Sequence, residues 1–214
     1  MTNQDYKNAA LAALKGNWAP AVLATIVFML IGIALSAPAA FFTVPSSPGF
    51  VAANSLQSFG MIFVLIPMEI GFYWAFVKLL KEGDANVTNN TFSYGFRGWG
   101  HKVWTMVLMG VAVMLGFICF IIPGIIIAFA YSMVPYLLVK HPELSATETL
   151  KASRMMMKGH KFDYFYLSLS FIGWIILGIF TLGIGYFWLL PYMQTSLAAF
   201  WDDVYNQAHP EPAE

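Results

Sequence analysis

Residues 103–139, VWTMVLMGVAVMLGFICFIIPGIIIAFAYSMVPYLLV, decide the fold class of this chain. They form two apolar runs joined at Pro123-Gly124, and they include no acidic or basic side chain. A helix needs about 20 mostly apolar residues to cross a bilayer, because its backbone must satisfy its own hydrogen bonds in hydrocarbon. We therefore interpret the stretch as a hairpin of two transmembrane helices with a tight turn at the proline and glycine.

The composition of the whole chain agrees with this interpretation. Of the 214 residues, 59% are hydrophobic and 10% are charged, whereas an average soluble domain has about 25% charged residues. The formal net charge is zero, which gives no reason to expect binding to nucleic acid. The single cysteine, Cys119, cannot form an internal disulfide or a cysteine-based metal site.

Six stretches are long and apolar enough to be membrane spans. We expect them at residues 19–40, 59–78, 103–122, 124–139, 164–180 and 183–201. The first is long for the core of a signal peptide and follows an amphipathic flank, so we interpret it as a spanning helix. The predicted fold is an all-α polytopic membrane helix bundle, with one integral membrane domain at 1–206 and a short acidic tail at 207–214.

The basic residues predict the orientation of the bundle. All 11 lie before the first span, between the second and third, or between the fourth and fifth. The opposite loops, Phe41 to Ser58, Pro123-Gly124 and Thr181-Leu182, carry no charge. Because cytoplasmic loops are enriched in Lys and Arg, we expect a multi-pass protein of the cell (plasma) membrane with both termini in the cytoplasm.

A recurring pattern indicates that the six spans form three hairpins. A basic residue followed by glycine precedes each odd-numbered span, at Lys15-Gly16, Arg97-Gly98 and Lys158-Gly159. We interpret the chain as three units, 1–81, 86–140 and 143–206, each with an amphipathic helix at the cytoplasmic interface and a transmembrane hairpin. Coincidence is the alternative, since Lys-Gly pairs are common.

The interfacial helix of the third unit has the clearest pattern. Ser145 to Glu148 forms a capping box, and apolar residues then recur at helical spacing as far as Met157. We expect this methionine face in the acyl boundary. Basic residues that we expect to contact lipid headgroups line another face or follow the helix: Lys151, Arg154, Lys158, His160 and Lys161. The alternative, which we favour, is that such helices seal the cytoplasmic end of the bundle.

Glu69 is the one ionisable residue well inside a predicted span, roughly 15 Å from its outer end at 1.5 Å per residue. A charged group at such depth is costly, so it is a functional candidate. Gln194 is a second polar residue at depth, and Tyr73 completes the candidate intramembrane polar site. Pro67 and Gly71 flank Glu69 and are expected to loosen its helix. The alternative is a neutral Glu69 that hydrogen-bonds a neighbouring helix as part of the packing.

Several motifs resemble a known family. They are Met157-Lys158-Gly159-His160-Lys161, the run from Leu167 to Trp174, Pro191-Tyr192 with Thr195, the opening from Ala12 to Trp18, and Pro123-Gly124 with Tyr131-Ser132-Met133. Together they are similar to the bacterial domain-of-unknown-function family 975. The resemblance covers most of the chain and implies an uncharacterised integral membrane protein of bacteria. It implies no reaction, substrate or site residue.

The motifs of soluble enzymes are missing from the sequence. The four histidines show no metal-ligand spacing, and no phosphate-binding glycine loop or nucleophile elbow occurs. We therefore expect no cofactor and no catalytic residue. Our first hypothesis is a non-catalytic membrane module, an accessory subunit or scaffold, whose partners are membrane lipids and other membrane proteins or further copies of the chain.

Two other functions stay open at this point. A small proton- or cation-coupled transporter or channel is indicated by Glu69 and by the prolines inside the even-numbered spans, because broken helices often mark binding sites. A membrane enzyme that acts on lipids is the weaker alternative. Its only plausible residues are His160, Lys161 and Asp163 at the inner interface.

Overall fold

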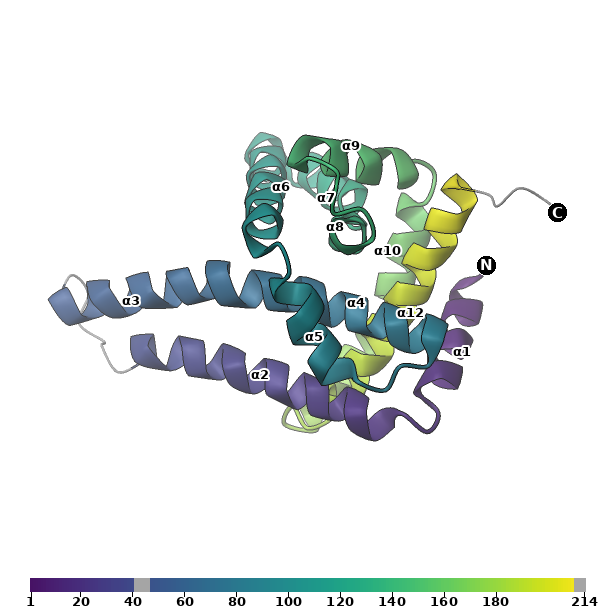
Figure 1. Cartoon of the computed structure of the whole chain (residues 1–214), viewed down its shortest axis with the longest axis horizontal. Helices are drawn as coiled ribbons and strands as arrows, with labels where there is room; N and C mark the ends of the chain where they lie inside the picture. The colour runs from purple at the N-terminus through teal and green to yellow at the C-terminus, as the bar shows by residue number, and fades with distance from the viewer. Residues whose placement is uncertain (41–46, 210–214) are drawn as a thin grey trace.

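The computed structural model describes residues 1–40 and 47–209. Within these residues every regular element is a helix and no strand occurs, which confirms the all-α class (Figure 1). The elements are α1 (Asn3–Leu14), α2 (Trp18–Ala40), α3 (Pro48–Gly60), the π-helical turn η1 (Met61–Leu65), α4 (Ile66–Glu82), α5 (Val87–Phe96), α6 (Trp99–Cys119), α7 (Ile121–Ala130), α8 (Val134–Lys140), α9 (Ala146–Met156), α10 (Lys161–Leu169), α11 (Ile172–Phe180) and α12 (Tyr186–Ala208).

Five helical segments of the described chain are long and apolar enough to cross a membrane, which indicates a membrane protein. They are Trp18–Ala37, Pro48–Glu82, Trp99–Cys119, Ile121–Lys140 and Lys161–Phe180. The sixth predicted span lies in α12, which is not among them. This helix has 23 residues, but Gln194, Thr195 and Ser196 interrupt its apolar sequence.

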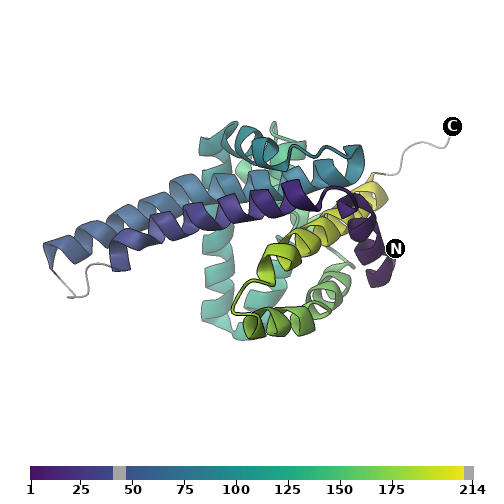
Figure 2. The same cartoon turned by 90° about the horizontal axis from the view of Figure 1, so that it is seen from below.

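The second predicted span is part of a much longer helix. α3, η1 and α4 form one segment of 35 residues, Pro48–Glu82, which is roughly 52 Å long at 1.5 Å per residue. A hydrocarbon core is about 30 Å thick. Its α3 end, with α2 at its side, projects away from the other helices, whereas its α4 end packs among them (Figures 1 and 2). The helix that includes Glu69 therefore begins at Pro48, 11 residues before the predicted start of the second span at residue 59.

The predicted outer loop from Phe41 to Ser58 is correspondingly too long. Residues 41–46 lie outside the described part, but from Pro48 onward the chain is helical. The side chain of Ser47 accepts a hydrogen bond from Phe50 N, and Pro48 occupies the first turn. Serine before proline is a favourable helix start, and the polar residues that follow simply lie on an exposed helix.

The fourth and fifth predicted spans are each interrupted. α7 and α8 are separated at Tyr131 to Met133, just before Pro135, and α10 and α11 are separated at Ser170-Phe171. Proline lacks a backbone donor, which explains the first interruption. Of the other two predicted interior prolines, Pro67 follows the π-helical turn, whereas Pro191 lies inside the uninterrupted α12.

The turn of the α6–α7 hairpin lies at Phe120, not at Pro123-Gly124 as predicted. Phe120 is extended (φ −166°), and α7 begins at the next residue. Pro123 falls in the first turn of α7, where a missing backbone N–H costs little. A Cβ on Gly124 would lie 2.4 Å from the Phe117 ring, so this glycine allows α6 and α7 to approach closely.

The glycines of the three basic-glycine pairs all have a positive φ. Gly16, Gly98 and Gly159 have φ values of 87°, 67° and 99°. Each stands where a short helix ends and a longer apolar segment begins, between α1 and α2, α5 and α6, and α9 and α10. Glycine adopts this left-handed backbone without steric cost. The pairs therefore make three similar corners in the chain.

α4 and α5 cross in very close contact at two glycines. A Cβ on Gly71 would lie 1.9 Å from Thr91 O and 2.6 Å from Gly95 N, and one on Gly95 would lie 2.5 Å from Pro67 O. The expectation that Gly71 loosens the helix is therefore wrong. Its missing side chain instead lets two backbones touch, as small residues do between membrane helices.

The first and last helices meet at one end of the molecule. The Tyr6 hydroxyl on α1 donates to Asp203 Oδ2 on α12 at 2.6 Å, and Lys81 at the end of α4 lies 2.8 Å from Asp202 Oδ1. Burial, together with the carboxylate of Asp203, raises the pKa of Tyr6 above its usual value. These contacts tie α12 both to α1 and to the end of α4.

α9 begins with the predicted capping box, in which Ser145 accepts from Glu148 N and the Glu148 side chain accepts from Ser145 N. Its apolar stripe does not face the acyl boundary, however. The stripe is buried against the protein at Ala146, Thr149, Leu150, Ser153 and Met157. Ser153 also donates to Ala130 O of α7 at 2.9 Å. The polar members of the stripe explain the difference, since they find partners in the protein.

Candidate functional site

A cavity of about 400 Å³ adjoins Glu69. α4, α6, α7, α8, α10 and α12 all contribute to its lining, together with the interruption between α7 and α8. Its volume lies within the range of about 300–1,000 Å³ that is usual for small-molecule sites. Its polar side chains are Glu69, Tyr73, Tyr131, Ser132, Tyr164 and Trp201, and the other lining residues are apolar.

Glu69 and Tyr73 are four positions apart in α4, so they lie one turn from each other on the same face of the helix. The Tyr73 hydroxyl donates a short hydrogen bond to Glu69 Oε1. Both side chains are half-buried, and among the described residues Glu69 forms no ion pair with Lys, Arg or His. This hydrogen bond comes from the helix of Glu69 itself, whereas the packing alternative predicted a partner on a neighbouring helix.

Two other residues of the lining have buried polar atoms without a partner in the described chain. These atoms are Ser132 Oγ and Trp201 Nε1. Buried polar groups are nearly always hydrogen-bonded, because an unpaired one costs free energy. Two unpaired groups beside a half-buried carboxyl are features of a site that accepts a polar ligand.

Aromatic pairs hold the cavity walls in place. The rings of Tyr73 and Trp201 are 5.5 Å apart at 67°, and those of Phe129 and Tyr164 are 5.4 Å apart at 65°. Edge-to-face pairs of this kind are favourable and restrict the side chains. The cavity is therefore bounded by rings from α4, α7, α10 and α12.

An interruption between two helices lines the cavity, and a π-helical turn lies close to it along the chain. Tyr131 and Ser132 of the lining belong to the interruption between α7 and α8, and Pro135 lies in the first turn of α8. The π-helical turn Met61–Leu65 precedes α4 and ends four residues before Glu69, outside the lining. π-helical turns and broken helices are frequent at functional sites. The sequence signal for this part of the site was the pair of prolines.

Gln194 does not line this cavity. It precedes Leu197 and Trp201 on α12 by three and seven positions, so it lies on the helix face that includes both lining residues. Its Oε1 is buried and has no partner in the described chain. Of the three predicted polar residues, the structure thus brings Glu69 and Tyr73 together and leaves Gln194 outside the cavity lining.

The five predicted headgroup contacts also lie outside the cavity lining. Lys151 and Arg154 are exposed on α9, Lys158 is exposed just after it, and His160 and Lys161 are half-buried at the following corner. His160 Nδ1 lies 3.4 Å from Asp163 Oδ2. The basic face of α9 is accordingly free of the protein core, as contact with anionic headgroups requires.

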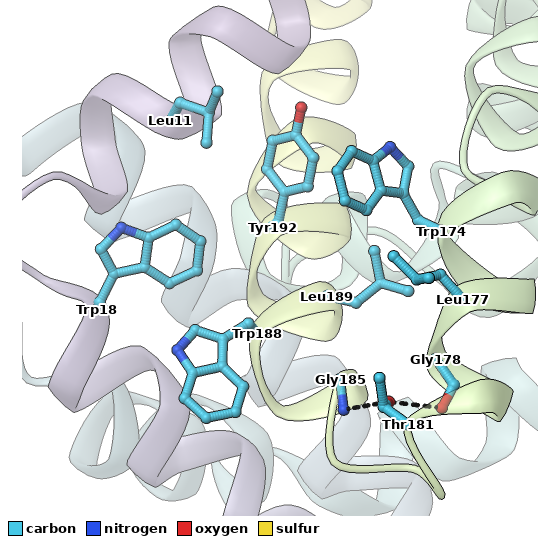
Figure 3. A pocket seen from close by; sticks show the side chains of 10 residues that line it. All are labelled: Leu11, Trp18, Trp174, Leu177, Gly178, Thr181, Gly185, Trp188, Leu189 and Tyr192. Carbon is cyan, nitrogen blue, oxygen red and sulfur yellow. Dashed lines mark hydrogen bonds between the residues drawn. The ribbon is translucent and has the colours of Figure 1, made fainter.

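A second cavity, of about 350 Å³, lies between α1, α2, α11 and α12 (Figure 3). Three tryptophans, Trp18, Trp174 and Trp188, surround it with Tyr192. Thr181 stabilises its lower edge, since its Oγ accepts from Gly185 N at 2.9 Å and donates to Gly178 O at 2.8 Å. No acidic or basic side chain lines it, so this cavity offers mainly apolar contacts to a ligand.

Metal chemistry has no evident site in the part of the chain that the structure describes. No group of three or more His, Cys, Asp or Glu side chains there is arranged to hold a metal ion. The cavity at Glu69 is therefore the main candidate site, because its lining includes a carboxyl group, whereas the second cavity has no acidic or basic side chain.

These features define an all-helical protein with the composition of a membrane protein and a polar cavity between its helices. Residues 105–208 match the family described as "Protein of unknown function (DUF975)". This match supports the resemblance seen in the sequence over that part of the chain, which does not include the opening motif from Ala12 to Trp18. No curated protein and no solved structure matches the chain.

Proposed function

We propose that this chain is a small membrane transporter whose substrate binds in the cavity at Glu69. The observation that supports the proposal is a ligand-sized cavity that reaches a carboxyl without an ion-pair partner. A carboxyl in a membrane-spanning helix is costly, and such groups commonly mark ion or substrate pathways. Exchange of a proton for a substrate at Glu69 would couple the two movements.

The interrupted helices support a transport role over a purely structural one. The α7–α8 interruption and the π-helical turn before α4 each lie near the cavity. Transporters place discontinuous helices at central binding sites, because the freed backbone groups and local mobility serve binding and gating. A scaffold or accessory subunit, our first hypothesis from the sequence, gives no role to this cavity.

The proposal includes six spans, with α12 as the sixth and both chain ends in the cytoplasm of a plasma-membrane protein. The contact between α1 and the end of α12 supports the placement of both ends on one side. The three left-handed glycine corners support a division into three similar hairpin units. The row of basic side chains on α9 supports a cytoplasmic position for this side.

Labelling of single cysteines tests this topology. In a Cys119→Ser background, Leu182→Cys places a thiol in the turn before α12, where Leu182 is 93% exposed, and Lys151→Cys places one on the exposed face of α9. We expect a membrane-impermeant maleimide to label Leu182→Cys in intact cells and Lys151→Cys only after permeabilisation. The unlabelled Cys119→Ser protein is the control. Labelling of both thiols from one side would contradict the six-span arrangement.

Proton flux into proteoliposomes tests the role of Glu69. We expect Glu69→Gln to reduce the flux, followed with a trapped pH-sensitive dye, to the rate of protein-free liposomes, because an amide cannot release a proton. Glu82→Gln is the matched control. It makes the same change near the end of the same helix, where the Glu82 side chain is 60% exposed and its ion pair with Lys78 contributes little. Equal fluxes for Glu69→Gln and the natural protein would remove the carboxyl from the mechanism.

A further inference from the structure

The charged groups that line the cavity are of one sign, negative. Glu69 is the only acidic or basic side chain in its lining, and no Lys, Arg or His of the described chain pairs with it. Within residues 1–40 and 47–209, the carboxyl accepts a side-chain hydrogen bond from Tyr73 alone. An anionic ligand would meet an uncompensated carboxylate, whereas a cation would neutralise it at short range in a medium of low dielectric constant.

The walls of the cavity favour an organic cation over a metal ion. Five aromatic side chains line it: Tyr73, Phe129, Tyr131, Tyr164 and Trp201. Aromatic faces attract ammonium groups, and aromatic cages are a known means of binding quaternary ammonium ligands. Metal ions such as Ca²⁺ and Mg²⁺ instead need several oxygen ligands at about 2–2.6 Å. A cavity of about 400 Å³ with a single carboxylate does not supply them.

The remaining side chains suit a ligand with an apolar body and one further polar group. Met106 and Met109 of α6 contribute flexible, polarisable thioethers that adapt to different shapes. Ser132 Oγ and Trp201 Nε1 are buried polar atoms of lining residues without a partner in the described chain. A rotation of either side chain toward the cavity would allow it to hydrogen-bond to a hydroxyl group of the ligand.

We infer that the cavity binds a small organic ammonium ion, with its cationic group at Glu69 and its alkyl groups against the aromatic walls. The inference rests on the proposed function in one respect, since it takes the cavity at Glu69 as the substrate site. It adds the chemical class of the substrate, which the transport proposal leaves open.

Equilibrium binding to the purified full chain in detergent tests this class. Isothermal titration calorimetry with choline, tetraethylammonium and 3,3-dimethylbutan-1-ol separates charge from shape, because the last compound is the neutral analogue of choline. We expect both cations to bind and the neutral alcohol to bind more weakly. Glu69→Gln should weaken choline binding by about 10- to 100-fold, as expected for loss of an interaction with a charged group. Glu82→Gln should leave it unchanged.

The possible outcomes separate this inference from the transport proposal. Binding of the alcohol as tight as that of choline, no binding of either cation, or an unchanged affinity in Glu69→Gln would each overturn the inference, even if proton flux still depends on Glu69. Binding of choline that depends on Glu69, without any flux through the protein, would instead contradict transport and leave the ligand class standing. A melting temperature equal to that of the natural protein verifies that Glu69→Gln is folded.

Discussion

Gly71→Ala is expected to destabilise the protein by about 3 kcal/mol or more, at the upper end of what overpacking costs. The added Cβ would lie 1.9 Å from Thr91 O and 2.6 Å from Gly95 N. Both are backbone atoms, so no side chain can rotate away to relieve the contact. α4 and α5 would have to separate along their whole crossing. Glu69 lies two residues from this contact, so the geometry of the cavity would change as well.

Thermal unfolding in detergent, followed by size-exclusion chromatography after heating, measures this effect. Gly32→Ala is the matched control, because a Cβ at that position in α2 meets nothing within 4 Å, so the change should be neutral or stabilise the helix by up to about 1 kcal/mol. Gly95→Ala should behave like Gly71→Ala, since its Cβ would lie 2.5 Å from Pro67 O. A melting temperature of Gly71→Ala equal to that of Gly32→Ala would show that the helices do not cross this closely.

The apolar runs predicted the helices well, because hydrocarbon leaves the backbone few alternatives to a helix. The run at residues 103–139 forms α6, α7 and α8, as its hydropathy indicated. What hydropathy could not locate were the helix ends. Ser47-Pro48 starts a helix inside a predicted loop, and Phe120 makes the turn assigned to Pro123-Gly124. The position of a helix end depends on local capping and packing. The mean hydropathy over a window of residues does not respond to either.

The buried face of α9 shows a second limit. Its residues recur at helical spacing, which identifies a stripe but not what covers it. Thr149 and Ser153 are polar members of that stripe, and Ser153 donates to Ala130 O of α7. A stripe that includes hydroxyl groups gains more from a protein surface with free carbonyl oxygens than from acyl chains. The sealing role, which we favoured, agrees better with this contact.

Only part of the cavity could be predicted from the sequence. Glu69 was recognised because a carboxyl is rare in an apolar span, and Tyr73 lies one helical turn away. Ser132, Tyr164 and Trp201 reach the same cavity from three other parts of the chain. No local pattern connects them, since their proximity arises from the packing of α8, α10 and α12 around α4. For Ser132, the interior proline at position 135 was the available sequence signal.

Gly110→Leu is expected to abolish ligand binding while Glu69 stays in place. Gly110 lines the cavity from α6, and a Cβ at this position meets nothing within 4 Å. Four added carbon atoms would occupy space that the substrate needs. The helix should tolerate the change, because leucine has a higher helix propensity than glycine. We therefore expect the melting temperature to stay equal or rise, while choline affinity falls by at least about tenfold, a loss of about 1.4 kcal/mol.

Gly100→Leu is the matched control for this occlusion. It makes the same change ten residues earlier on α6, also with nothing within 4 Å of the new Cβ, and it lies outside the cavity lining. Calorimetry and proteoliposome flux on both variants then distinguish two mechanisms. Loss of binding and flux in Gly110→Leu alone means that the substrate passes through this cavity. Unchanged choline binding in a folded Gly110→Leu protein would mean that the substrate does not bind in the part of the cavity that Gly110 lines. Any effect of Glu69 on binding would then have to come from a different site.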